Sequence, residues 1–144
     1  LCADLTDGRF VSVWSGELDG QERPLTGFSC GQAPLLYYRA AEDSCVVLET
    51  DTVPLGCMDD LEVTLRAPLR MEPGDVFAVL SDGVVDAADA KGERFGTGRV
   101  IDVLTRHRKS RAAEMMSALR RALAHFTHGV PADDDRTAVI IKRD

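Results

Sequence analysis

The pattern of hydrophobic and polar positions predicts strands in the first part of the chain. Arg9–Ser15 is rich in β-branched and aromatic residues and lies between two glycines, which is typical of a strand. Two short apolar runs, Leu35–Tyr38 and Cys45–Leu48, are separated by the polar Arg39–Ser44 and predict a hairpin. In Leu61–Leu65, apolar residues alternate with polar ones, which indicates a strand with one solvent-exposed face.

Helical periodicity appears only in the second part. The unbroken apolar run Val76–Leu80 follows a Pro-Gly-Asp turn and predicts a strand buried on both faces. Apolar positions within Gly98–Arg106 then recur at helical spacing, so we expect a short helix there. The clearest helix begins after Ser110, a favourable N-cap residue. Its apolar stripe, with a period of about 3.6 residues, comprises Ala112, Met115, Met116, Leu119, Ala122, Leu123 and Phe126.

Stop signals and a closing strand complete the predicted order of elements. Gly129 and Pro131 end the long helix, and Thr137–Ile141 has the composition of a last strand. No linker, repeat or low-complexity segment interrupts the chain. Strands followed by helices and a closing strand favour an α+β domain over residues 1–144, in which helices cover a largely antiparallel sheet.

Composition and charge narrow the range of functions. The chain has 144 residues, of which 44% are hydrophobic and 28% charged, which is typical of one soluble globular domain. Seventeen Lys and Arg against 24 Asp and Glu give a net charge of -7, so we do not expect a nucleic acid partner. No apolar stretch approaches the roughly 20 residues of a membrane span, and no secretion signal opens the chain. We therefore expect a cytoplasmic protein.

The cysteines give no sign of a metal site or a redox pair. They are irregularly spaced and contain no C-x-x-C motif. Reduced, structural thiols are therefore expected at Cys2, Cys30, Cys45 and Cys57.

Two aspartates occupy positions that suit metal ligands. Asp82 follows the buried strand and precedes Gly83, which lets the backbone turn away from a carboxylate at the end of the sheet. Asp134 lies in the acidic run Asp133–Asp135, where adjacent carboxylates repel one another unless solvent or a cation separates their charges. Carboxylate oxygens suit Mg²⁺ or Mn²⁺. Taken alone, each feature is more often a turn or a solvated loop.

Four segments in order resemble the type 2C metal-dependent protein serine/threonine phosphatases, in particular the bacterial branch typified by stage II sporulation protein E and the sigma-factor regulatory phosphatases. Leu69–Gly96 is similar almost position by position to that branch's Pro-Gly-Asp, Asp-Gly-Val and Gly-Glu-x-Phe-Gly block. Asp134–Arg143 resembles its closing Asp-Asp-x-Thr strand, Arg9–Asp19 its Phe-initiated strand, and Phe28–Tyr37 its Asn-Ala-Gly-His segment. The four segments span nearly the whole chain.

The resemblance implies both a fold and a chemistry. The fold is an antiparallel β-sandwich flanked by helices, of which this chain would form the C-terminal part. Asp82 and Asp134 match the family's metal-binding positions, with Asp135 and Gly83 next to them in supporting roles. The implied reaction is hydrolysis of phosphoserine or phosphothreonine by a water bound between two Mn²⁺ or Mg²⁺ ions.

Two departures from the family pattern limit the implied activity. Cys30 and Gln32 stand where the family has Ala and His. The family's upstream Asp-x-x-Gly segment, whose Asp bridges both metals, has no counterpart, because Asp4 and Asp7 immediately precede the first matched strand. Together with the opening Leu1, this suggests a truncated domain.

Two hypotheses for the function follow. In the first, the chain is part of a phosphatase acting on a phosphoprotein, with an anti-sigma-factor antagonist as one candidate substrate and homodimerisation left open. In the second, it is a noncatalytic phosphatase-like domain that binds a protein partner. The presence of both C-terminal metal acids favours the first, since clustered acids without a cation are destabilising.

Overall fold

The computed structural model describes residues 9–18, 24–58, 60–63 and 65–144. The chain forms two compact units and passes between them more than once. The first unit comprises Leu1–Ala33 and Glu49–Met71, and the second comprises Pro34–Leu48 and Glu72–Asp144. The assignment of residues 1–144 to one domain remains a prediction.

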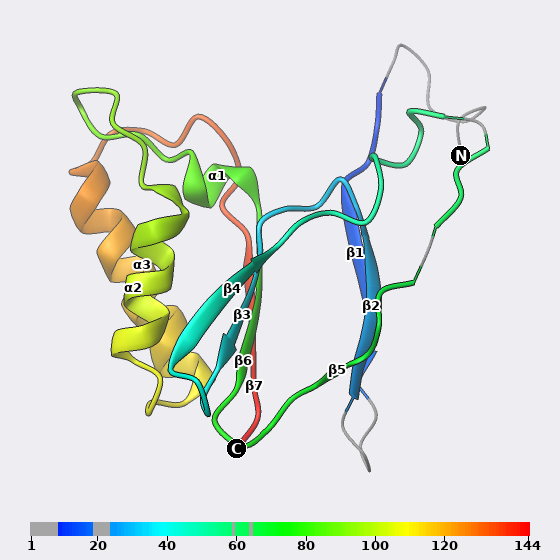
Figure 1. Cartoon of the computed structure of the whole chain (residues 1–144). Helices are drawn as coiled ribbons and strands as arrows, with labels where there is room; N and C mark the ends of the chain where they lie inside the picture. Colours follow the sequence, from blue (N-terminus) through cyan, green and yellow to red (C-terminus); the bar gives the residue numbers. More distant parts are fainter. Residues whose placement is uncertain (1–8, 19–23, 59, 64) are drawn as a thin grey trace. The chain divides into compact units, whose positions relative to one another are not determined.

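The first unit contains a three-stranded antiparallel sheet in the order β1-β2-β5 (Figure 1). Its strands are β1 (Val13–Leu18), β2 (Pro24–Cys30) and β5 (Leu69–Arg70). Gly16 and Gly27 face each other across β1 and β2, and the Trp14 indole lies beside both. A Cβ atom on Gly16 would come within 2.5 Å of that ring, so the glycine pair makes room for the tryptophan.

The predictions for this unit are only partly correct. The strand expected over Arg9–Ser15 begins at Val13 and runs on to Leu18. The strand expected over Leu61–Leu65 is wrong, because its described residues are irregular and pair with no strand of the described chain. Leu65 is 67% exposed. Alternation alone does not make a strand when no neighbouring strand accepts its hydrogen bonds.

The second unit is a four-stranded antiparallel sheet in the order β4-β3-β6-β7, with α2 and α3 lying together on one side of it (Figure 1). Its strands are β3 (Leu35–Arg39), β4 (Ser44–Leu48), β6 (Val76–Leu80) and β7 (Ala138–Lys142). Its helices are α1 (Asp82–Val85), α2 (Gly96–Arg106) and α3 (Ala112–Thr127). The α+β class predicted from the sequence is confirmed.

The core of this unit lies between the sheet and the two longer helices. Val76, Ala78 and Leu80 of β6 pack in one cluster with buried residues of the helices, among them Leu104 and Met115. Each large side chain buried in this way contributes on the order of 1.5–3 kcal/mol. β6 is paired on both edges, and four of its five residues are buried, in agreement with its apolar sequence.

Most element predictions for the second unit are confirmed, with small shifts of their ends. The hairpin of β3 and β4 is present, and β6 pairs on both sides. The closing strand begins at Ala138 instead of Thr137. The N-cap of α3 is Arg111, so the prediction of Ser110 is wrong. Ser110 belongs instead to the preceding turn, where its amide donates to the His107 carbonyl.

The buried Asp75 carboxylate connects the turn that follows β3 with the turn that precedes β6. The Asp75 carboxylate accepts hydrogen bonds from the Tyr37 hydroxyl (2.7 Å), the Ala40 amide (2.8 Å) and the Glu72 amide (2.8 Å). The Asp75 carbonyl accepts from the Arg143 amide. The Pro-Gly-Asp turn of the sequence therefore fixes β3 and β6 relative to each other.

No helix in the described part of the chain is long and apolar enough to cross a membrane. Cys30, Cys45 and Cys57 are free thiols, while Cys2 lies outside the described residues.

Candidate functional site

Asp82 lies where β6 passes into the single helical turn α1. Ser81 is extended, with φ −79° and ψ 160°, and Asp82 is the first residue of the turn. The exposed Asp82 carboxylate accepts a hydrogen bond from the Gly83 amide at 2.8 Å. The carboxylate of this exposed residue is thus held at the end of a buried strand.

Gly83 allows the acidic segment to approach this turn. It is buried, and a Cβ atom at this position would lie 2.3 Å from the Asp135 carbonyl oxygen and 3.3 Å from that of Asp134. Any side chain would therefore push the two segments apart. Gly83 is required by packing, because the backbone that carries Asp134 lies directly against it.

Ser81 joins the same two segments by hydrogen bonds. Its hydroxyl donates to the Asp135 carbonyl (3.0 Å) and accepts from the Thr137 amide (2.9 Å), and its amide donates to the Thr137 carbonyl (2.9 Å). The sequence analysis did not identify this serine. The sequence feature that could have indicated it is a small hydroxyl residue placed between a buried strand and an Asp-Gly pair. At such a position the hydroxyl can reach the backbone of a neighbouring strand.

Asp134 and Asp135 precede β7 and are both exposed. The Asp134 carboxylate accepts from the Asp135 amide at 2.7 Å, in the same way that Asp82 accepts from Gly83. Neither the Asp82 nor the Asp134 carboxylate forms an ion pair within the described residues. The segments that carry the two predicted metal ligands thus meet at one corner of the second unit.

The chemistry of these donors suits a hard divalent cation. Mg²⁺ and Mn²⁺ favour carboxylate oxygens, and both side chains can offer a free oxygen. No group of three or more acids, cysteines or histidines suited to a metal ion occurs among the described residues. Asp82 and Asp134 would therefore fill only part of a coordination shell, with water, substrate or a further ligand completing it.

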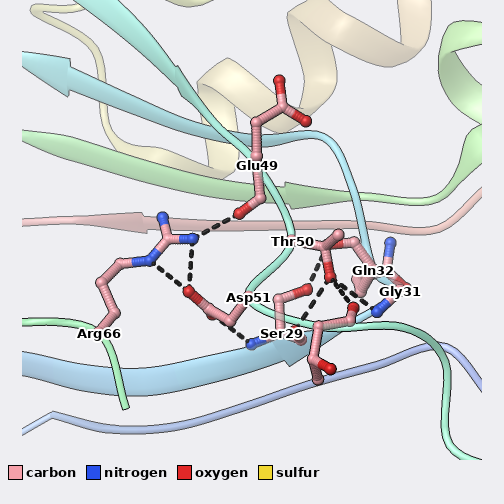
Figure 2. A network of polar contacts seen from close by, with 8 residues as sticks. Ser29, Gly31, Gln32, Glu49, Thr50, Asp51 and Arg66 are labelled. Atoms are coloured by element: carbon pink, nitrogen blue, oxygen red, sulfur yellow. Dashed lines mark hydrogen bonds and ion pairs between the residues drawn. The ribbon is translucent and has the colours of Figure 1, made fainter. Parts of the chain in front are cut away.

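The first unit contains a second polar cluster, centred on Asp51 (Figure 2). The Arg66 guanidinium donates to the Asp51 carboxylate from Nε (3.0 Å) and Nη2 (2.8 Å), and Nη2 also donates to the Glu49 carbonyl. The Ser29 amide donates to the other Asp51 oxygen at 2.7 Å. The Asp51 carboxylate is largely buried, with an exposed fraction of 13%. This ion pair was not predicted from the sequence.

The same cluster fixes the segment that departs from the family pattern. The Gly31 amide donates to the Thr50 hydroxyl at 2.8 Å (Figure 2). Gly31 has φ +70° and lies against Pro54, which would be 2.4 Å from an added Cβ. Cys30 is fully buried, and burial together with the nearby Asp51 charge raises the pKa of its thiol. The polar groups of this cluster bind one another, so it stabilises the loop and offers no reactive group.

A comparison with protein families gives one match over the whole chain. The sequence profile described as "Stage II sporulation protein E (SpoIIE)" matches residues 1–144. Protein IcfG of Synechocystis sp. is 24% identical over 134 residues, which cover 93% of this chain and 21% of that protein.

Solved structures share the fold at low sequence identity. The SiaA-PP2C domain of Pseudomonas aeruginosa matches with a TM-score of 0.71 and 24% identity, over 88% of this chain and 49% of that one. The RsbU and RsbW domains of Rv1364c from Mycobacterium tuberculosis match with a TM-score of 0.73 and 19% identity, over 98% and 38%. The manganese-presoaked phosphatase domain of SpoIIE from Bacillus subtilis gives 0.62 and 17%, over 92% and 56%. The chain therefore spans about half, or less, of the length of these relatives.

Proposed function

Because the chain belongs to the stage II sporulation protein E (SpoIIE) family, we propose that Asp82 and Asp134 bind Mn²⁺ or Mg²⁺ in a metal-dependent protein serine/threonine phosphatase. The observation that carries this proposal is the packing of Gly83 against the Asp134–Asp135 backbone. Ser81 reinforces that packing through Asp135 and Thr137. Two carboxylates far apart in the sequence thereby share one corner of the fold.

The residues of this site divide into ligands and supports. Bound in this position, two divalent ions would lower the pKa of a bridging water and neutralise charge on the phosphoryl group. Asp82 and Asp134 would hold the ions. The Asp135 main chain is already bound by Ser81 and Asp134, and Gly83 supplies the space for it. We therefore assign Asp135 and Gly83 supporting roles.

The proposed substrate is a phosphoserine or phosphothreonine on a regulatory protein in the cytoplasm. An anti-sigma-factor antagonist is the first substrate to test, because the family resemblance includes the sigma-factor regulatory phosphatases. A homodimer is the oligomeric state to test alongside it.

A second candidate function is a noncatalytic, phosphatase-like module that binds a protein partner. It is favoured by one observation, that the described residues contain no group of three or more acids, cysteines or histidines that could hold a metal ion. This candidate predicts partner binding without turnover. The two functions differ in whether metal is needed.

Metal binding is tested by titrating Mn²⁺ into the protein and into Asp82→Asn and Asp134→Asn, with calorimetry as the measurement. We expect each substitution to weaken Mn²⁺ binding at least about tenfold, because a neutral amide replaces a charged ligand. Asp133→Asn is the matched control, since it removes an exposed charge from the same acidic run. Unchanged affinity in both ligand variants would refute the proposed site.

Catalysis is tested by comparing this chain with a form extended upstream, on a phosphoserine peptide. We expect little turnover from residues 1–144 alone, because the family's bridging Asp has no counterpart in them, and Mn²⁺-dependent turnover from the extended form. Asp82→Asn in the extended form should abolish it. Turnover that persists in EDTA would contradict the metal mechanism.

A further inference from the structure

The second unit contains a cavity of about 660 Å³. It lies between α3 and the residues that enter β7. Its apolar wall includes Val84, Leu119 and Leu123, all buried members of the core. A volume of this size can hold several side chains of a bound peptide or a small molecule.

Three arginines also line the cavity, Arg120 and Arg121 from α3 and Arg136 from the segment before β7. Six other arginines of the described chain pair with an acid. None of the three cavity arginines has such a partner among the described residues. Their positive charges are gathered at one cavity, and no acid of the described residues neutralises them there.

Arg136 gives the most specific indication of a ligand. Its Nε atom is buried and has no hydrogen-bond partner within the described structure. A buried donor left without an acceptor is destabilising. Phosphate oxygens are strong acceptors for a guanidinium group, which can bind two of them through parallel hydrogen bonds.

The shape of the surface indicates an extended ligand. A second hollow of about 330 Å³ adjoins the first along α3 and shares Ser117 and Arg121 with it. Two of the residues that line the cavity are close in sequence to the proposed metal ligands, since Val84 follows Asp82 by two residues and Arg136 follows Asp134 by two.

We propose that this cavity binds a phosphorylated segment of a protein substrate, with the phosphate against the three arginines and neighbouring apolar side chains against Val84, Leu119 and Leu123. This inference rests on the proposed phosphatase function and assigns its substrate-binding surface. The arginines supply charge and hydrogen bonds, while the apolar wall and the adjoining hollow favour a peptide over free phosphate.

The test measures binding of a fluorescein-labelled phosphoserine peptide with flanking leucines, by fluorescence anisotropy in EDTA. The protein is used in the full length that its gene encodes. Arg136→Gln should weaken binding about tenfold or more, and Arg121→Gln, an exposed change on α3, should weaken it severalfold. Arg106→Gln is the matched control, because it removes an exposed, unpaired arginine from α2 and should leave binding unchanged. Circular dichroism checks that each variant is folded.

Three outcomes would overturn the docking surface. These are wild-type affinity in both cavity variants, equal binding of the unphosphorylated peptide, and displacement by inorganic phosphate at the same concentration as by unlabelled peptide. The Mn²⁺ titration distinguishes a failure of the docking surface from a failure of the proposed phosphatase function. If the arginine variants bind the peptide normally while Asp82→Asn loses Mn²⁺, only the docking surface fails. If Asp82→Asn keeps Mn²⁺ while Arg136→Gln loses the peptide, only the phosphatase chemistry fails.

Discussion

Gly83 shows how one missing side chain shapes the candidate site. Gly83→Ala would place a Cβ atom 2.3 Å from the Asp135 carbonyl oxygen, so the acidic segment must move. We expect a loss of about 1–3 kcal/mol in the free energy of unfolding, as for other overpacked sites. We also expect weaker Mn²⁺ binding, because Asp134 moves with its backbone. Urea denaturation and metal titration measure the two effects.

Gly98→Ala provides the matched control for this substitution. Gly98 lies within α2, is exposed, and has open space around its Cβ position. Alanine in a helix interior is more stable than glycine by roughly 0.5–1 kcal/mol, so this variant should be as stable as the wild type or slightly more so. A Gly83→Ala variant that matched Gly98→Ala in both measurements would show that the close contact is unimportant.

The N-terminus of α3 offers a test at the scale of an element. Arg111 occupies the N-cap with extended backbone, and its amide donates to the Glu114 carboxylate at 3.0 Å. Arginine has no acceptor for the amides of the first turn. Arg111→Ser would supply one and complete a capping box with Glu114. We expect the free energy of unfolding to rise by about 0.5–2 kcal/mol, measured by chemical denaturation.

Ser110→Ala tests the sequence prediction that Ser110, and not Arg111, is the N-cap of α3. Ser110 precedes the N-cap, and its carbonyl, not its hydroxyl, accepts from Lys142 Nζ at 2.7 Å. Its replacement should therefore leave stability nearly unchanged. If Ser110→Ala were instead as destabilising as the loss of an N-cap, by about 1 kcal/mol, the helix would begin where the sequence pattern placed it.

At the scale of the whole molecule, stability should decline in alkaline solution. Burial raises the pKa of the Cys45 thiol from 9.0 to about 11. Burial, followed by the hydrogen bond to Asp43, raises the pKa of Tyr38 from 10.0 to about 12. Between about pH 9 and 12 the unfolded chain therefore binds fewer protons than the folded protein, so the free energy of unfolding falls as pH rises. Urea denaturation at pH 8, 10 and 11 should show this decline.

Tyr38→Phe identifies the contribution of the tyrosine to that decline. The variant loses a hydrogen bond of 2.6 Å to Asp43 and should be about 0.5–1.5 kcal/mol less stable at pH 8. Because it has no hydroxyl to ionise, its stability should fall less steeply than that of the wild type above pH 10. Parallel curves for the two proteins would exclude Tyr38 as a source of the pH dependence.

The sequence alone determined the elements whose local pattern is complete. The run Val76–Leu80 is apolar throughout, so a buried interior strand could be predicted there, and β6 is buried at four of its five positions and paired on both edges. The stripe of α3 likewise fixes which face of the helix packs inward. The order of the matched segments also indicated the family and singled out Asp82 and Asp134 as ligands to test.

Only the tertiary structure decided which residues meet. Nothing local to Ser81, Gly83 or Asp135 states that their backbones touch, because that contact depends on the pairing of β6 with β7. The cavity of Arg120, Arg121 and Arg136 arises in the same way, from a helix and a loop that are separate in the sequence. Leu61–Leu65 shows the converse, since its alternating pattern finds no partner strand among the described residues. Periodicity specifies how a segment folds, whereas a binding site depends on long-range contacts that periodicity does not encode.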